Sequence, residues 1–313
     1  MFRTFKQLAM MAAGVAIVPG TVLAAGTAPA VADQTLAQPV PEAIVPGPPP
    51  LPTLMSRQVG VSPADAVGPQ RTARAQCPSQ TKVVGGGGEG VVSPGFTNQL
   101  ILTRLVPDTA TNQFVVTVTD FSPFSPQDEW FVVAYAICAP TPFDYTVIPV
   151  PTESSEPIQQ VTAPCPGREA YGTGAEIVAQ AGEKVGLQTV LSTATGSEVT
   201  VRAQDTNGAV VQLWRLIGYA ICARAETFVQ TSNVTGSARR ILVRATCPTG
   251  FLLGTGARIN NAPHDIVITR IRPSSDLLTV EVMVTRVSSP TPSPPDATWT
   301  VTVQTICNTA LTN

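Results

Sequence analysis

The sequence predicts an all-β protein made of three tandem, disulfide-closed modules that resemble β-sandwiches. Three observations point to this class. A Cys, Gly and Trp pattern recurs three times, β-branched runs alternate in polarity, and no segment carries a capped 3.6-residue pattern. The same repeat also fits an alternative architecture, one closed three-fold domain like a β-prism.

The N-terminal residues 1–32 are typical of a secretory signal peptide. Arg3 and Lys6 form a positive start, and an apolar run from Leu8 to Val18 is too short to span a bilayer. Small residues offer a cleavage site after Ala32, with Ala24 as the competing site. No later segment has the apolar length of a membrane span. We therefore expect a secreted or cell-wall-associated protein.

Residues 33–54 are rich in proline, alanine, valine and glycine. Proline lacks a backbone donor and favours the extended polyproline II conformation. The segment is therefore predicted to be a disordered, semi-rigid tether between the signal peptide and the repeats.

Rare residue types define the repeat. Each copy has a Cys-Pro pair, then a glycine cluster, and closes with Trp, seven residues and Cys. The pattern uses every cysteine and tryptophan in the chain: Cys77, Trp130 and Cys138; Cys165, Trp214 and Cys222; Cys247, Trp299 and Cys307. A valine lies eighteen residues before the first Cys of each copy (Val59, Val147, Val229). The modules are thus expected at 55–138, 142–222 and 225–307.

Strands are predicted where β-branched residues alternate with polar ones, at 114–119, 199–202 and 278–284. In the second copy, residues 205–208 (Asp-Thr-Asn-Gly) predict a tight hairpin that joins 198–203 to 210–222, because Asn and Gly tolerate positive φ. The other copies have longer loops there, at 121–129 and 287–298. A glycine cluster that recurs at one site predicts a bulge or a close strand contact.

Paired cysteines in an exported chain predict disulfides. Internal repetition favours the pairing that gives each copy the same bond: Cys77–Cys138, Cys165–Cys222 and Cys247–Cys307. Each bond would close a loop of about 60 residues, which is worth about 4 kcal/mol in the chain-entropy account. A metal or redox site would need closely spaced pairs such as C-x-x-C, and the chain has none.

Trp and Cys of the closing strand lie eight positions apart, so they share one face but stand about 26 Å from each other. Trp130, Trp214 and Trp299 are therefore expected at the end where the variable loops enter. There they would either plug the core or form aromatic platforms for a sugar or peptide. The candidate binding residues are these tryptophans together with Phe121, Phe124, Asp128, Glu129 and Asp296 in or beside the loops.

Searches for chemistry identify no catalytic residue, cofactor or metal ligand. The single histidine, His264, has no counterpart in the other copies, and no G-x-S-x-G motif is present. No Lys-Ser/Thr follows the glycines at 85–88 at the spacing of a phosphate-binding loop. Loss of residues 1–32 removes two cations and changes the net charge from −2 to −4, which argues against nucleic acid as a ligand.

The repeat unit, C-P-x-G with a glycine-rich turn and W-x7-C preceded by Tyr-Ala-Ile at 135–137 and 219–221, resembles uncharacterised exported repeat proteins of Gram-positive bacteria. The resemblance covers most of residues 55–307. The C-P-x-G phrase is also similar to that of vitelline membrane outer layer proteins, which implies a three-fold β-prism, although the cysteine spacing differs. Copy one lacks the glycine, Gly167 stands one place early in copy two, and Gln304-Thr305-Ile306 replaces Tyr-Ala-Ile in copy three.

These observations predict a non-catalytic binding or structural protein that presents hairpin loops on a repeated β-scaffold to cell-wall carbohydrate or to a protein. Repetition would add avidity. Two alternatives remain: a secreted hydrolase with a site between modules, and a secreted protease inhibitor that presents a proline-rich loop.

Overall fold

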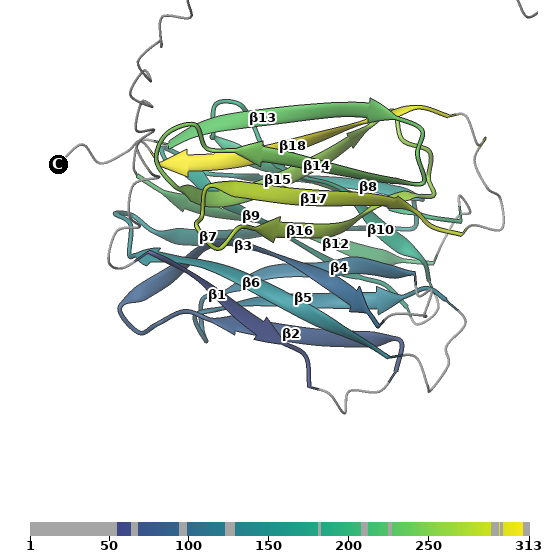
Figure 1. Ribbon diagram of the computed structural model, residues 1–313, viewed down its shortest axis with the longest axis horizontal. Coiled ribbons are helices and arrows are strands. Elements are labelled where there is room, and N and C mark those ends of the chain that lie inside the picture. Colours follow the sequence, from purple (N-terminus) through teal and green to yellow (C-terminus); the bar gives the residue numbers. More distant parts are fainter. Residues whose placement is uncertain are drawn as a thin grey trace, which may run out of the picture. The chain divides into compact units, whose positions relative to one another are not determined.

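The computed structural model describes residues 55–63, 68–93, 99–122, 129–180, 183–207, 212–224, 227–288, 294 and 297–308. These residues form eighteen β-strands and no helix, so the predicted all-β class is confirmed. In Figure 1 the strands of all three sheets lie along roughly the same axis, with arrows pointing both ways. The predicted signal peptide and the proline-rich tether lie outside the described residues.

Each repeat contributes six strands. The first repeat contains β1 (Ser56–Val61), β2 (Gln70–Gln76), β3 (Thr81–Val92), β4 (Leu100–Asp108), β5 (Gln113–Asp120) and β6 (Trp130–Pro140). The second contains β7 (Thr146–Ser154), β8 (Ile158–Pro164), β9 (Glu169–Val178), β10 (Val185–Ser192), β11 (Glu198–Asp205) and β12 (Trp214–Ala223). The third contains β13 (Thr227–Gly236), β14 (Arg240–Thr246), β15 (Leu252–Asn260), β16 (Ile266–Pro273), β17 (Thr279–Arg286) and β18 (Trp299–Asn308).

The predicted strands at 114–119, 199–202 and 278–284 correspond to β5, β11 and β17. Strict alternation of exposed and buried residues marks β8 and β14, as expected for strands with one face in a core. The third strand of each repeat is different. Most residues of β3, β9 and β15 are buried whichever way they point, so these strands lie inside the assembly.

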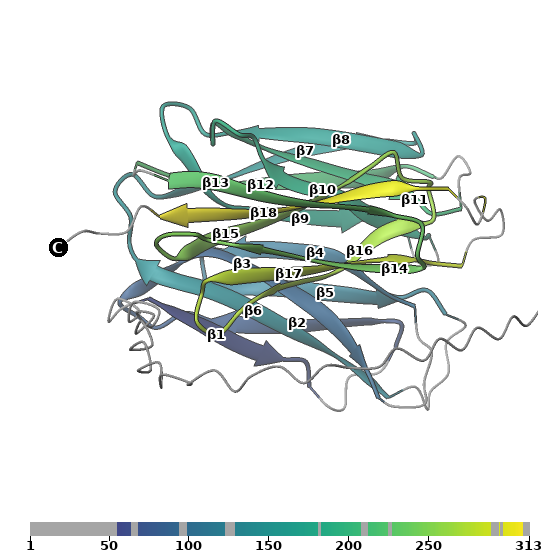
Figure 2. The ribbon, with the colours of Figure 1, turned by 45° about the horizontal axis from the view of Figure 1, so that its top comes forward.

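The strands are distributed over three six-stranded sheets, each shared between two repeats. Sheet A has the order β1-β6-β3-β16-β17-β14, sheet B the order β2-β5-β4-β9-β12-β7, and sheet C the order β13-β18-β15-β10-β11-β8. Each repeat thus gives its first, third and sixth strands to one sheet and its second, fourth and fifth strands to another. Figure 2 shows strands of the first repeat beside strands of both other repeats.

The three third strands meet backbone to backbone around a common line. Bulges at Val84, Tyr171 and Leu253 interrupt their pairing with the sixth strands. A Cβ on Gly85 would lie 2.1 Å from the carbonyl oxygen of Leu253. One on Gly172 would lie 2.3 Å from that of Val84, and one on Gly254 would lie 2.2 Å from that of Tyr171. The close strand contact predicted from the glycine clusters is therefore confirmed, and it joins all three repeats in a cycle.

The tight hairpin predicted at residues 205–208 is not formed. Strand β11 pairs with β8 and β10 in sheet C, whereas β12 pairs with β7 and β9 in sheet B. The buried Thr206 donates its backbone N–H and its hydroxyl to the carbonyl of Lys184, which holds the end of β11 against the start of β10. The turn residues ended the strand as expected, but local turn chemistry carries no information about which strands pair. Strands β5 and β6, and strands β17 and β18, likewise belong to different sheets, and most residues of the loops predicted between them lie outside the described residues.

The disulfides Cys77–Cys138, Cys165–Cys222 and Cys247–Cys307 are present, and no cysteine is free in the described part of the chain. The first cysteine of each pair directly follows the second strand of its repeat, and the second lies on the sixth strand. Since those strands belong to different sheets, each disulfide ties two sheets together, A to B, B to C or C to A. Buried apolar side chains of all three repeats form one contiguous core cluster.

Candidate functional site

The tryptophans stand where the closing strands begin, at the end of the sheets that we call the loop end. All three are buried: Trp130 is 3% exposed, Trp214 1% and Trp299 1%. The guanidinium carbons of Arg71 and Arg286 lie 4.4 and 5.1 Å from the ring centres of Trp130 and Trp299. An aromatic platform needs an exposed ring face, so this burial favours the core-plug interpretation of the tryptophans.

The remaining sequence-predicted candidates separate into two groups. Phe121 is buried, and it packs with Ile101, Val267 and Val287 in a small apolar cluster at the loop end. Glu129 is exposed, immediately before β6. Phe124, Asp128 and Asp296 lie outside the described residues.

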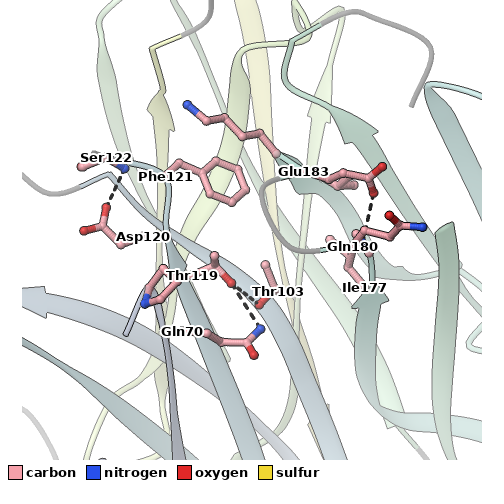
Figure 3. Close-up of a pocket in the computed structure, with 13 residues that line it drawn as sticks. Gln70, Thr103, Thr119, Asp120, Phe121, Ser122, Ile177, Gln180 and Glu183 are labelled. Atoms are coloured by element: carbon pink, nitrogen blue, oxygen red, sulfur yellow. Dashed lines mark hydrogen bonds between the residues drawn. The ribbon is translucent and has the colours of Figure 1, made fainter. Parts of the chain in front are cut away.

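The candidate site is a pocket at the loop end of sheet B, where the first and second repeats meet (Figure 3). It has a volume of about 440 Å³, within the range of small-ligand sites. Five chain segments line it: the start of β2, Thr103 of β4, the end of β5 with the residues that follow it, the end of β9, and the start of β10. Its lining residues are Pro69, Gln70, Thr103, Thr119, Asp120, Phe121, Ser122, Ile177, Ala179, Gln180, Glu183, Lys184 and Val185.

Two carboxylates shape the pocket by binding backbone amides. Asp120 Oδ1 accepts hydrogen bonds from the backbone N–H groups of Ser122 (2.8 Å) and Gln99 (3.1 Å). Across the pocket, Glu183 accepts from the backbone N–H groups of Gln180 (3.2 Å) and Gln212 (3.1 Å), one on each oxygen. These bonds fix the segments that form the rim of the pocket.

Hydroxyl and amide groups form the floor between the carboxylates (Figure 3). The Thr103 hydroxyl is 3.1 Å from that of Thr119, and Gln70 donates its amide to Thr119 at 3.5 Å. Phe121 and Ile177 supply apolar surface beside them. A pocket with acceptors, donors and a few apolar faces is suited to a ligand that carries several hydroxyl or amide groups.

Sequence reasoning identified Phe121 but missed Gln70, Thr103, Gln180 and Glu183. Gln70, Gln180 and Glu183 lie at or just beyond strand ends, where binding residues are common, whereas Thr103 lies within β4. Their convergence depends on pairing between β4 and β9, which joins residues of different repeats.

We call the place where strands of two repeats pair within one sheet a junction. The two junctions of the first repeat contain the same ionic group of arginine, glutamate and tyrosine. In sheet A, Arg270 on β16 pairs with the buried Glu89 on β3, with 2.6 Å between Nε and Oε2, and Tyr135 donates to the same carboxylate at 2.6 Å. In sheet B, Arg104 lies 3.2 Å from Glu176, to which Tyr219 donates at 2.8 Å. The arginine and glutamate occupy matching register positions in both junctions.

These ionic groups change the titration of their members. Burial first, and then the hydrogen bond and negative charge of the neighbouring glutamate, raise the pKa values of the Tyr135 and Tyr219 hydroxyls well above normal. Glu281 extends the group in sheet A. Burial opposes its ionisation, but hydrogen bonds from Arg244 and Arg270 and their charges outweigh this effect and lower the pKa of Glu281.

The third junction, in sheet C, lacks this ionic group. There Thr189 on β10 stands opposite Arg258 on β15, in the register positions that arginine and glutamate occupy elsewhere. Gln304 takes the place of the tyrosine. Its side chain crosses over Gly256 and binds the backbone N–H and C=O of Ser192, both at 2.8 Å. The replacement of Tyr-Ala-Ile by Gln-Thr-Ile in the third repeat therefore accompanies a change in all three partners.

The residues that the alternative hypotheses would use do not converge with the pocket. His264 is half-buried between β15 and β16, and it does not line the pocket at the loop end. Within the described ranges, no group of three or more His, Cys, Asp or Glu side chains is arranged to hold a metal ion. The same ranges contain no helix long and apolar enough to cross a bilayer.

In comparisons with known proteins, no protein family and no curated protein matches the chain.

Proposed function

We propose that the chain is an exported, non-catalytic binding protein of the cell envelope that holds carbohydrate at the loop end of its β-scaffold. Three disulfides are consistent with an extracellular location. The observation that carries the proposal is the pocket of about 440 Å³, whose lining combines carboxylate, amide and hydroxyl groups with the faces of Phe121 and Ile177. Sugars present the complementary mixture of hydroxyl groups and apolar ring faces.

The proposal is favoured over catalysis by the role of the two carboxylates. Asp120 and Glu183 each accept backbone N–H groups, so their first task is to hold the rim of the pocket. A protein partner is the second candidate. It is supported by the exposed Glu129 immediately before β6 and would be revealed by a pull-down of envelope proteins with the same two variants.

The test is a glycan array together with a pull-down on purified cell wall, using a variant that fills the pocket. Gln180 is exposed and lines the pocket, so Gln180→Trp should obstruct it without disturbing the core. Gln230→Trp is the matched control, because Gln230 is exposed on β13 and does not line this pocket. We expect binding to fall at least tenfold in Gln180→Trp only.

Point substitution is preferable to deletion of residues 121–129, because deletion would remove Phe121 from its apolar cluster and unfold the loop end. Equal binding by both tryptophan variants would show that this pocket is not the carbohydrate site. A purified protein that retains no glycan and no cell-wall material would contradict the proposed function itself.

A further inference from the structure

The outer face of sheet C contains a hollow at the place where the other two sheets have their ionic groups. This hollow has a volume of about 670 Å³ and is lined by residues of all six strands of the sheet. The lining positions on β11, β13 and β18 are two apart, at 200 and 202, 229 and 231, and 302 and 304. Side chains two apart on a strand point to the same face, so the hollow is an open trough on the sheet.

Five of the lining residues form one row across the sheet. The register places Thr302 opposite Arg258, Arg258 opposite Thr189, Thr189 opposite Arg202, and Arg202 opposite Gln160. These residues belong to β18, β15, β10, β11 and β8. With neighbouring strands about 4.8 Å apart, the row is about 19 Å long. A trough of that length suits a chain molecule better than a single ion.

The charge of the trough is positive. Arg202 and Arg258 both line it, and no Asp or Glu is among its lining residues. One strand separates them, which puts their backbones about 10 Å apart. No salt bridge, side-chain hydrogen bond or ring contact joins either guanidinium to another described residue, and the Nε atom of Arg202 is buried without a partner.

Comparison with the matching positions in sheets A and B shows that the junction in sheet C lacks a carboxylate. Arg258 stands where Glu89 and Glu176 neutralise an arginine, and Thr189 stands where Arg270 and Arg104 supply it. The third junction therefore keeps a positive charge and lacks its counter-ion, and threonine and glutamine stand where the other junctions have arginine and tyrosine. Two cations that face one trough without an anion repel each other, and an anionic ligand would relieve that repulsion.

We propose that this trough binds an acidic glycan, with carboxylates of uronic acid residues paired to Arg202 and Arg258. Arginine binds carboxylate through parallel hydrogen bonds. The threonine, asparagine and glutamine side chains that line the trough both donate and accept, as sugar hydroxyls require. The site is separate from the pocket at the loop end, and the inference does not depend on that pocket.

Two other polyanions fit the trough less well. Nucleic acid binding uses aromatic rings on which bases stack, and the lining residues of the trough include none. A peptide commonly binds a sheet by adding a strand at its edge, where backbone groups are free. The row runs across the face of the sheet and reaches an edge strand only at Gln160, so its recognition groups are side chains.

Titration calorimetry with hexagalacturonic acid and its fully methyl-esterified form tests the proposal on the full chain. We expect the acid to bind and esterification to weaken binding at least tenfold. Arg202→Gln and Arg258→Gln should each weaken binding by roughly tenfold to a hundredfold, as loss of a charged hydrogen bond implies. Arg74→Gln is the matched control, because Arg74 is exposed on β2 in sheet B, and it should leave binding unchanged.

A second variant installs the ionic group of the other junctions. The triple substitution Thr189→Arg, Arg258→Glu and Gln304→Tyr should abolish binding while the protein stays folded. Gln180→Trp, which fills the other pocket, should have no effect on the acid, so failure of one site is distinguishable from failure of the other. The proposal is overturned if the acid does not bind, if esterified and acidic forms bind equally, or if both single arginine variants bind normally. Tighter binding of polyglutamate or of inorganic phosphate alone would also overturn it.

Discussion

Substitution of Gly85 by alanine tests the backbone contact that joins the three repeats. The added Cβ would lie 2.1 Å from the carbonyl oxygen of Leu253, whereas ordinary contacts begin near 3.4 Å. The two strands would have to separate by about 1.3 Å at this point. Strand β15 cannot yield easily, because it is hydrogen-bonded to β18 on one side and to β10 on the other.

Overpacking of a core costs about 1–3 kcal/mol when side chains can adjust, so a clash with backbone is expected to cost about 3 kcal/mol or more. In a protein of this size each kcal/mol lowers Tm by about 2–4 °C, which gives a fall of about 6–12 °C. Urea and thermal unfolding followed by tryptophan fluorescence measure the loss, since each repeat has one buried tryptophan.

Gly236→Ala is the matched control. Gly236 is also a strand glycine, but the nearest atom to its added Cβ is the flexible side-chain end of Ile241 at 3.3 Å. This variant should change the free energy of unfolding by less than about 1 kcal/mol. If Gly85→Ala loses no more stability than Gly236→Ala, the backbone contact at the centre of the repeats is not real.

The remaining predictions concern the disulfides and the buried ions. Replacement of Cys165 and Cys222 by alanine should cost about 4 kcal/mol of unfolding free energy, because the bond closes a loop with a sequence separation of 57. A loss below about 1 kcal/mol in urea titration would be inconsistent with that role. Glu89→Ala should cost about 3 kcal/mol, since it removes one of the two carboxylates paired with the partly buried Arg270 and leaves the Tyr135 hydroxyl without its acceptor. Glu176→Ala should cost less because its arginine is more exposed, and the reverse order in thermal melts would contradict the burial argument. The pKa of Glu281 is lowered in the folded state, so its ionised form stabilises the fold above about pH 4.5 and this contribution is lost on acidification. The stability difference between the wild type and Glu281→Gln should shrink from pH 6 to pH 3, and a constant difference would refute the assignment.

The covalent framework and many of the strands could be predicted from the sequence. Repetition of Cys and Trp favoured the pairing within each copy, and the three observed disulfides confirm it. Alternating β-branched residues identified β5, β11 and β17. The recurrent glycines identified a close contact, since no other residue allows backbones to approach so near.

The sharing of sheets between repeats could not be predicted. Pairing of β4 with β9 or of β3 with β16 involves few residues. The local sequence of a strand does not indicate which other strand it pairs with. The prediction of a hairpin at 205–208 was wrong for the same reason. The pocket at the loop end and the trough on sheet C both depend on these pairings, so sequence reasoning found Phe121 alone among the lining residues.

Positions at which one copy departs from the other two were informative about the site. Gln304 was visible as a departure from the Tyr-Ala-Ile pattern, but its meaning required the register of β15 and β18. Once that register is known, Thr189, Arg258 and Gln304 replace an Arg, Glu and Tyr group as a set. A departure shared by three neighbouring register positions is a stronger indication of function than any one of them.

The central claim is that each sheet belongs to two repeats, and cleavage between the first two repeats tests it most directly. Phe143, in the segment between β6 and β7, is 71% exposed, so a protease site inserted after it should be accessible. With disulfides intact, the cleaved chain should elute as one particle in gel filtration and unfold in a single transition, because β4 still pairs with β9 and β3 with β16. Elution of the first repeat as a separate, folded β fragment would contradict the account.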